Sequence, residues 1–357
     1  MNAMRSRKHA VLRSLREKEE HMAAWKKAAV TVGGILLVLL IVFGAGILVA
    51  KHYLNKINRV DESTVSTISP EDEDFEVDEL PPETTNSGVE RPMDSNEILW
   101  APVEPLKDEQ LINLMLVGQD RRKGEGRQRS DTMILCSINP KTNQVSLISF
   151  MRDLYVQIPG GYSDNRLNAA YYFGGFPLLD DAMFKNFGIT IDGNIEVDFE
   201  RFVKVIDVLG GVDIVLTAEE ANYLGKGTFA GKNHLDGEMA LEYARIRAID
   251  NDFYRTARQR AILEAAFKKM KDLGLSEITA LLNAMLPSLT TDLSDGQILA
   301  LMGTLFPGLR SMEIQSYRVP ADQTYYDAMI RGMAVLVPDL ERIQELLRTE
   351  YLPLRTY

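Results

Sequence analysis

An uncharged apolar segment near the N-terminus constrains this chain more than any other feature. Residues 28–50 contain no charged side chain over 23 residues, and a helix of that length, at about 1.5 Å per residue, spans the hydrocarbon core of a bilayer. The segment is longer than the apolar core of a cleavable signal peptide, which is the alternative. The sequence therefore predicts one transmembrane helix.

Basic residues concentrate around this segment. Residues 1–59 carry eleven Lys and Arg against three acids, a net charge of +8, and because the whole chain has a formal charge of −11, the remainder carries −19. The positive-inside rule then predicts a cytoplasmic basic tail over residues 1–27 and an extracytoplasmic location for everything after the helix. An acidic bulk also argues against nucleic acid as a partner.

Residues 51–105 are expected to form an acidic extracytoplasmic linker. Between 61 and 96 the chain is rich in Pro, Ser, Thr and acids and has almost no periodic apolar pattern. Such a composition is typical of a solvated spacer that holds a domain away from the membrane.

The predicted folded domain covers residues 106–357. Three short apolar runs, at 111–117, 132–138 and 145–150, resemble central strands covered on both faces, and further strands are expected at 189–198, 211–216 and 312–319. Strands interleaved with helical patterns indicate an α/β fold, with a central mostly antiparallel or mixed β-sheet layered by helices in an α-β-α arrangement. The helical patterns lie at 176–187, 198–208, 235–246, 252–272, 275–286, 294–305 and 338–349.

Cysteine and histidine are too few for several common kinds of site. Cys136 is the only cysteine, so no disulfide forms within the chain, and of four histidines only His234 lies in the predicted domain. Zinc sites with several His or Cys ligands are thereby excluded, and a Ser-His-Asp or Cys-His site would depend on that one histidine. Any metal is expected to be a hard cation bound by carboxylates.

Charged residues flank the three apolar runs where their strands reach one edge of the sheet. Short connections favour an antiparallel meander for these strands. Carboxylates and guanidiniums at one edge suit a magnesium pyrophosphate site, with oxygen ligands for the ion and fork-shaped donors for phosphate. A surface loop with solvated ion pairs is the alternative. The residues that converge are Asp120, Arg121, Arg129, Asp131, Arg152 and Asp153.

A second charged region begins the helical pattern at 252–272. The inward stripe of this helix is apolar in its later turns, but its first turns are polar. The polar part consists of Asp252, Arg255, Thr256 and Gln259. Polar groups that point toward a core need partners there. The same spacing places Arg260 on the solvent side and Arg258 at the margin. An ion-paired helix start facing solvent is the alternative.

With these residues in view, the chain resembles the LytR-CpsA-Psr (LCP) family of bacterial cell-wall ligases. The matching stretches occur in the right order between about 110 and 265, which is more specific than any single motif. The predicted tail, membrane helix and outer domain also suit the family. The stretches include "NLMLVGQDRR", "QRSDTMILCSINPKTNQVSLISFMRDLYVQIPG", "RLNAAYYFGG" and "HLDGEMALEYARIRAIDNDFYRTARQR".

This chain departs from the usual family pattern at three places. Gln119 stands between Gly118 and Asp120 where a serine is usual, Phe150-Met151 replaces a common Ile-Pro, and Arg166 stands where lysine is frequent. Since the charged positions are retained, these departures bear on substrate preference rather than on the chemistry. No familiar motif covers 275–357.

The resemblance implies transfer of an anionic glycopolymer, such as teichoic acid or capsule, from a polyprenyl pyrophosphate carrier to a peptidoglycan hydroxyl, with release of polyprenyl phosphate. The location would be the cell membrane of a Gram-positive-type envelope. A non-catalytic polyprenyl-phosphate binder that regulates the wall, and a lipid-linked pyrophosphate hydrolase, are the alternatives. Positioning and electrostatics would supply most of the catalysis.

The expected residue roles follow from combining the resemblance with the charge pattern. Mg²⁺, or Mn²⁺ in its place, is expected as the cofactor, with Asp120 and Asp131 as ligands. Asp131 or Asp252 is the candidate base, and an apolar groove between sheet and helices should hold the lipid. The phosphate-binding set consists of a clamp, Arg121, Arg152, Arg247, Arg255 and Gln259, and secondary contacts, Arg129, Arg166 and Arg245.

Overall fold

The structure, a computed structural model, describes residues 54–60, 65–78, 91–106, 110–119, 127–197, 199–274 and 290–354, and five single residues between 275 and 289. The chain divides into two compact units, Met1–Lys56 and Ile57–Tyr357, and the fold is that of the second. The apolar segment 28–50 lies outside the described residues. None of the helices that the structure describes is long and apolar enough to cross a bilayer.

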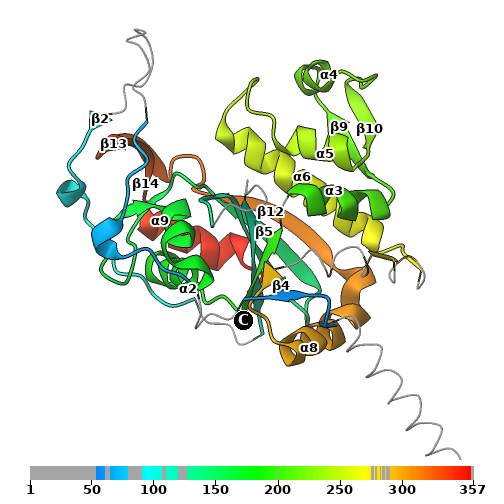
Figure 1. The fold of residues 1–357 in the computed structure, drawn as a ribbon, viewed down its shortest axis with the longest axis horizontal. Helices are drawn as coiled ribbons and strands as arrows, with labels where there is room; N and C mark the ends of the chain where they lie inside the picture. The colour runs from blue at the N-terminus through cyan, green and yellow to red at the C-terminus, as the bar shows by residue number, and fades with distance from the viewer. Residues whose placement is uncertain are drawn as a thin grey trace, which may run out of the picture. The chain divides into compact units, whose positions relative to one another are not determined.

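A mixed sheet forms the centre of the second unit (Figure 1). The three predicted apolar runs pair as an antiparallel meander of β3, β4 and β5, whereas β8 and β12 join its two sides in parallel. The expected central sheet is confirmed as a mixed one. In the described part of the chain seven strands form it, in the order β1 (Asn58–Arg59), β11 (Thr290–Thr291), β8 (Gly193–Val197), β3 (Ile112–Gln119), β4 (Ser130–Asn139), β5 (Gln144–Phe150) and β12 (Glu313–Val319).

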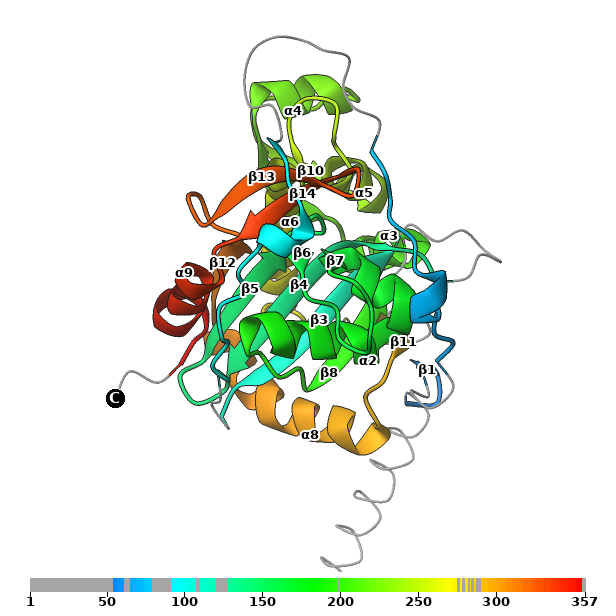
Figure 2. The same cartoon turned by 90° about the vertical axis from the view of Figure 1, so that its left-hand side faces the viewer.

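Helices cover both faces of this sheet, as the two perpendicular views show (Figures 1 and 2). Alternate strand residues point to opposite faces, so Met115 and Leu135 pack in one apolar cluster and Leu114 and Ile134 in another. The first cluster is closed by α2 (Leu167–Phe187) and α9 (Leu340–Leu346), which a π-helical turn (Leu347–Tyr351) follows. The second is closed by α6 (Asp252–Met270) and α8 (Asp295–Leu305).

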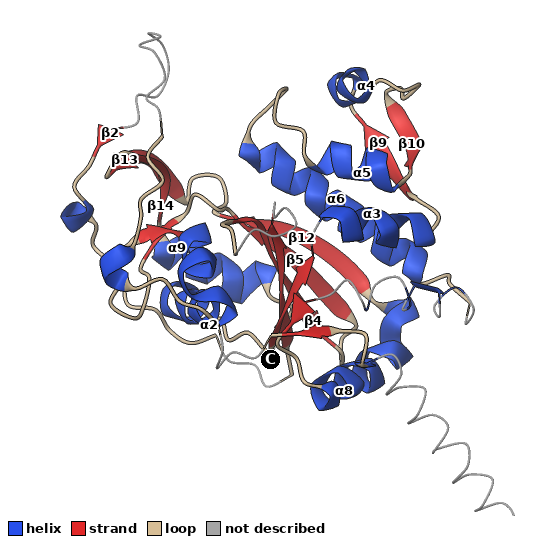
Figure 3. Cartoon of the chain, viewed as in Figure 1, coloured by secondary structure: helices blue, strands red, loops and turns tan. Residues whose placement is uncertain are grey.

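A smaller layer of helices and a hairpin packs on α6 (Figure 3). The run at 211–216 is a strand as expected, but it pairs with β10 in a separate antiparallel hairpin rather than in the central sheet. This layer presents one side of α5 toward the sheet. Its elements are α3 (Phe199–Val208), β9 (Val212–Leu216), α4 (Ala218–Leu224), β10 (Gly231–Leu235) and α5 (Gly237–Ala244).

Beyond the meander lies another small sheet, formed by strands that sequence periodicity did not reveal. The strand β14 (Met333–Pro338) pairs with β13 (Tyr325–Ile330), which pairs with β2 (Arg91–Pro92). The short strands β6 (Tyr155–Val156) and β7 (Asn165–Arg166) form a pair beside it.

Residues 65–78, named the acidic strap below, lie against the folded domain. The Ile68 amide donates to the Phe173 carbonyl at 2.9 Å, and the Asp78 amide donates to the Gly332 carbonyl at 2.9 Å. These contacts differ from the passive spacer that the composition favours, because alternating acids of the strap meet arginines of the domain. Composition alone does not reveal such pairing.

Candidate functional site

Asp131 is the centre of the candidate site. It is the second residue of β4, and it lies opposite the point between Gly118 and Gln119 where the pairing of β3 with β4 shifts register. Its carboxylate accepts from Arg152 Nη1 at 2.7 Å and from Arg247 Nη2 at 3.1 Å. The backbone carbonyl of the same residue accepts from Arg255 Nη2 at 3.1 Å.

Three distant segments therefore deliver the arginines to one point. Arg152 follows the end of β5, Arg247 lies in the loop after α5, and Arg255 occupies the first turns of α6. Asn251 caps that helix, since its side chain accepts from the Phe253 amide at 3.1 Å. The structure brings these three arginines together with Asp131 at one edge of the sheet, as the sequence predicts.

Carboxylates surround the same guanidiniums. Asp252 Oδ1 lies 2.6 Å from Arg255 Nη2, and Asp153 Oδ1 lies 3.4 Å from Arg152 Nε. Asp252 Oδ2 also lies 4.0 Å from Arg152 Nε. Positive and negative groups thus alternate, which keeps a dense cluster of arginines together without a bound anion.

The cluster shifts the pKa values of its members. Burial alone would raise the pKa of the Asp131 carboxyl, but the three guanidiniums around it hold that pKa below its ordinary value. Burial raises the pKa of Asp153 and lowers that of Arg255. For Arg152 the neighbouring carboxylates outweigh burial and raise the pKa. Asp131 is therefore an anion at neutral pH.

Several buried polar atoms at the site lack a hydrogen-bond partner among the described residues. They include Arg255 Nε, Gln259 Oε1 and Asp252 Oδ2. Leaving a buried donor or acceptor unpaired costs about 1–3 kcal/mol, so such atoms are rare unless a ligand completes them. The unpaired atoms lie on the polar face of α6 that the sequence pattern singled out.

An apolar cavity of about 340 Å³ opens next to the arginines, between the sheet and the helices. Polar side chains, among them Asp131, Arg247 and Arg255, line one part of it, and aliphatic and aromatic side chains line another. The expected groove thus has a definite lining that the sequence did not identify. The apolar part consists of Leu116, Val117, Ile134, Val197, Phe202, Leu241, Ala244, Ile262 and Leu263.

The loop that carries Asp120 and Arg121 lies outside the described residues, but both of its ends are fixed. Gln119 is buried, donates to Tyr171 Oη at 2.9 Å and accepts from the Gln128 amide at 2.8 Å. Tyr171 in turn donates to Glu196 at 2.6 Å. The glutamine that replaces the usual family serine therefore ties the loop to α2 and β8. The sequence pattern did not indicate this role for Tyr171.

Of the expected secondary contacts, one lines the cavity and two engage the acidic strap. Arg245 lines the cavity at the end of α5. Arg129 lies 2.6 Å from Asp74 Oδ1. Arg166 Nη1 lies 3.4 Å from Glu76 Oε2, and Asp78 contacts its other terminal nitrogen.

Two further arginines of α6 are buried away from the cavity lining. Arg258, which the helical pattern placed at the margin, donates to Glu220 at 2.8 Å and to the Ile246 carbonyl at 3.0 Å, and also pairs with Asp250. The prediction that Arg260 faces solvent is wrong, because it is only 8% exposed. The strand β12 extends the sheet beyond β5 and covers that side of α6, and burial lowers the pKa of Arg260 to about 10.

His234, the one histidine of the predicted domain, lies far from this chemistry in the hairpin. Its Nδ1 is 2.8 Å from Asp213 Oδ1, and both side chains are more than 45% exposed. An exposed surface pair of this kind contributes little to stability.

Comparison with known proteins places the chain among cell-wall proteins. The model of the LytR_cpsA_psr family matches residues 82–350. A polyisoprenyl-teichoic acid--peptidoglycan teichoic acid transferase, TagU, of Oceanobacillus iheyensis is 30% identical over 323 residues, which cover 87% of this chain and 92% of that protein. The protein of the same name from Bacillus mycoides is 33% identical over 214 residues, covering 59% and 68%.

A solved structure of TagT bound to LI-WTA has a similar fold. It superposes with a TM-score of 0.55 at 26% sequence identity, and the match covers 69% of this chain and 94% of that one. The match over nearly the whole of the solved chain shows that the sheet and its helical layers are the shared architecture.

Proposed function

We infer the function from the premise that this chain belongs to the LytR_cpsA_psr family. Its relatives are named teichoic acid transferases that act on peptidoglycan. The chain is accordingly a transferase that attaches an anionic glycopolymer to peptidoglycan. The arrangement of arginines around Asp131, beside an apolar cavity, is the single observation that carries the finer proposals below.

We propose that the donor is a glycopolymer linked to a polyprenyl pyrophosphate. A pyrophosphate needs fork-shaped cationic donors, and Arg152, Arg247 and Arg255 provide three from one edge of the sheet. A polyprenyl chain needs an apolar enclosure, and the cavity of about 340 Å³ begins where those arginines end. A site with cationic side chains next to an apolar cavity matches a lipid pyrophosphate better than a soluble nucleotide or sugar phosphate.

The proposed reaction is a phosphoryl transfer in which atoms and charge balance. A peptidoglycan hydroxyl oxygen attacks the phosphorus that bears the glycopolymer, and the bond from that phosphorus to the bridging oxygen breaks. The bridging oxygen leaves with polyprenyl phosphate, and the hydroxyl proton passes to a carboxylate. Charge grows on the bridging oxygen, so stabilisation there accelerates the reaction.

Each residue has a definite part in this scheme. Arg255 is buried and Arg152 is half-buried, and carboxylates fix both side chains, so they are preorganised to bind the phosphates. Arg247 is the most exposed of the three arginines and can follow the substrate as it enters. Gln259 presents an amide to the same cavity. Asp252, whose Oδ2 lacks a hydrogen-bond partner, is the favoured proton acceptor, with Asp131 as the alternative.

Mg²⁺, or Mn²⁺ in its place, is the proposed cofactor. Asp131 supplies hard carboxylate oxygens of the kind that these ions prefer. Among the described residues no group of three or more His, Cys, Asp or Glu forms a cation cage, and the second proposed ligand, Asp120, lies in the loop beyond them. A cation bound to Asp131 would neutralise phosphate charge and free the arginines from that carboxylate.

We also propose that the basic tail is cytoplasmic, that residues 28–50 anchor the chain in the cell membrane, and that the domain works outside in a Gram-positive-type envelope. This topology would place the apolar cavity close to the lipid that carries the donor. The proposal rests on the charge distribution around the apolar segment.

Product analysis tests the proposed donor and reaction. Purified full-length chain with Mg²⁺ is expected to move glycopolymer from a polyprenyl pyrophosphate donor to peptidoglycan oligomers. Chelation of Mg²⁺ should stop this transfer, and Asp120→Ala should weaken its dependence on Mg²⁺. Free phosphorylated glycan without acceptor would indicate a hydrolase, and tight donor binding without any product would indicate a non-catalytic regulator. Either of these two results would overturn the transfer chemistry.

A further inference from the structure

The acidic strap carries a regular alternation of acids where it passes the basic site. Asp74, Glu76 and Asp78 project toward arginines, whereas Phe75 and Val77 lie between them in the sequence. In an extended chain alternate side chains share one side. The strap therefore presents a row of three carboxylates to the domain.

This row engages two arginines that border the site described above. Arg129 Nη2 lies 2.6 Å from Asp74 Oδ1, and Arg129 Nε lies 3.8 Å from Glu76 Oε2. Arg166 Nη1 lies 3.4 Å from the same Glu76 oxygen, and its Nη2 contacts Asp78. Glu76 thus connects the two guanidiniums in the way that one phosphate group would.

Arg129 and Arg166 border the arginines that surround Asp131. Asp153 lies 3.4 Å from Arg152 Nε and 3.8 Å from Arg166 Nε, so it joins the strap's partner to the central arginines. Arg129 stands two residues before Asp131 at the start of β4. An anionic chain that leaves the central cluster along this edge would meet the arginines that the strap now occupies.

Burial differs between the two sides of these pairs. The side chains of Arg129 and Arg166 are 15% and 5% exposed, whereas those of Asp74 and Glu76 are 62% and 52% exposed. The arginines are built into the domain, and the carboxylates rest on it from outside. Exposed carboxylates on a strap contribute little binding energy each, so a stronger anion can replace them.

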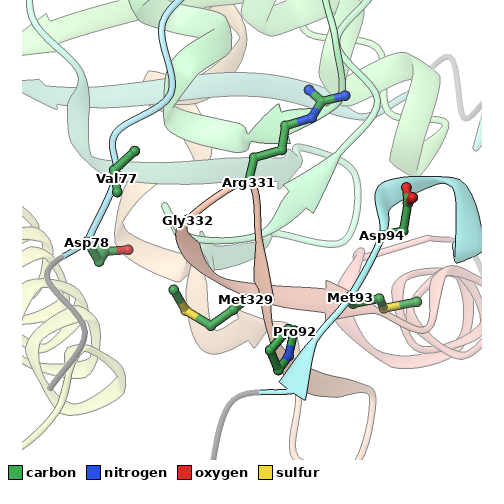
Figure 4. A pocket seen from close by; sticks show the side chains of 8 residues that line it. All are labelled: Val77, Asp78, Pro92, Met93, Asp94, Met329, Arg331 and Gly332. Atoms are coloured by element: carbon green, nitrogen blue, oxygen red, sulfur yellow. The ribbon is translucent and has the colours of Figure 1, made fainter. Parts of the chain in front are cut away.

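Hydrogen bonds hold the strap at each end, and Phe75 packs against the small sheet between them. Glu73 accepts from the Ser163 amide at 2.9 Å and from its hydroxyl at 2.5 Å. Asp78 accepts from the Ala334 amide at 2.7 Å. Figure 4 shows Val77 and Asp78 beside the Arg331–Gly332 turn, where they line an open pocket with Met329. At this end the strap borders an open pocket.

We propose that the acidic strap is an internal competitor for an extended polyanion, and that Arg129 and Arg166 form a track for the phosphate groups of the glycopolymer once the strap is displaced. The ligand class is a linear chain of phosphate esters. This inference rests on the proposed function for the identity of the polymer, but the competition itself requires only an anionic chain. The strap keeps the track closed to weakly charged ligands.

A matched pair of variants tests the competition. Asp74→Asn with Glu76→Gln removes two strap charges that face the arginines and leaves Asp78 to pair with Arg166. Glu71→Gln with Asp72→Asn removes the same charge from exposed strap residues that make no side-chain ion pair within the described residues. Both variants are made in the full chain, and calorimetry measures binding of linear polyphosphate at constant ionic strength.

The first variant is expected to bind polyphosphate about fivefold more tightly than the parent, since it loses two weak competing pairs, whereas the second should match the parent. Equal affinity in all three proteins, or an equal gain in both variants, would overturn the proposal. Asp74→Asn alone leaves Glu76 and Asp78 of the strap on Arg166 and should show a smaller gain in affinity. This single variant guards against a folding defect in the double variant.

Hydrogen exchange provides a second measurement on the unaltered chain. Polyphosphate should speed exchange of the Ser163, Asp78 and Ala334 amides, because displacement of the strap removes their acceptors. Unchanged or slower exchange there would count against displacement. Both measurements omit donor and acceptor, so a chain without transferase activity can still confirm the strap, and an active transferase can still refute it.

Discussion

Arg255 and Arg258 lie one turn apart on α6 and are equally buried, each with a side chain 3% exposed. The guanidinium of Arg258 is paired inside the protein with Glu220, the Ile246 carbonyl and Asp250. Arg255 shares its partners with other arginines, and its Nε has no hydrogen-bond partner among the described residues. Burial alone therefore does not identify a functional arginine, whereas incomplete pairing beside a cavity does.

The largest expected effect is on transfer. Arg255→Ala should reduce the transfer rate by about 10³-fold, because a preorganised guanidinium that stabilises developing phosphate charge is worth about that much. Its effect on the melting temperature should be small, since Arg255 crowds other arginines. Single-turnover assays with a lipid-linked donor measure the first quantity, and calorimetry the second.

Arg255→Lys sharpens this result. Lysine keeps the charge but not the fork, so an intermediate rate is expected if two phosphate oxygens are bound at once. Transfer at the parental rate in either Arg255 variant would remove this residue from the proposed mechanism.

The next effect is on stability. Arg258→Ala leaves Glu220 and Asp250 without their cation and should lower the free energy of unfolding by about 3 kcal/mol. Denaturant titration monitored by fluorescence measures the loss. A double variant, Arg258→Met with Glu220→Gln, should recover part of the loss, because it removes a buried charge on each side.

If Arg258→Ala proved as stable as the parent, Arg258 would not have the structural role assigned to it. If Arg255→Ala proved less stable than Arg258→Ala, the assignment of Arg255 to function rather than to stability would also be wrong. Arg258 has a structural role. From α6 it donates to the Ile246 carbonyl, in the loop that carries Arg247, and to Glu220 in α4.

The smallest effect concerns Asp131 and depends on pH. The folded state lowers the pKa of this carboxyl, so its contribution to stability is present above the ordinary value near 3.8 and is lost as the pH falls through the lower folded value. Asp131→Asn should therefore lower stability by about 1 kcal/mol at pH 7 and by less at pH 3.

Unfolding at both pH values checks this prediction. A matched substitution, Asp213→Asn, alters an exposed aspartate of the hairpin that pairs with Lys232 and His234 outside the site. A stability difference for Asp131→Asn that stays constant from pH 7 to pH 3 would show that the carboxylate is not held ionised by the arginines.

Much of the fold could be predicted because its signals are local. The three apolar runs became β3, β4 and β5, and the helix expected at 252–272 is α6 at Asp252–Met270. The strands β13 and β14 were not predicted, since short strands in a small sheet lack a long run or a clear alternation. Their pairing depends on contacts beyond the segment itself.

The site was predictable in its central part for the same reason. Strand ends and a helix start fix where Asp131, Arg152 and Arg255 must lie once the meander is assumed. Which arginine would be fully paired, and which would face the cavity, was not predictable, because the partners come from segments about 40 to 120 residues away in the sequence. Helical spacing predicted that Arg260 lies on the opposite face of α6 from Arg255. It could not predict that β12 would cover that face.

By itself, the sequence determined the repeating geometry and the position of each charge along the chain, since periodicity follows from the backbone. Only the tertiary structure decided the strap's place on Arg129 and Arg166, the lining of the cavity, and the division between Arg255 and Arg258. Those outcomes depend on which surfaces meet, and a charge has no fixed role until folding determines which opposite charge lies beside it.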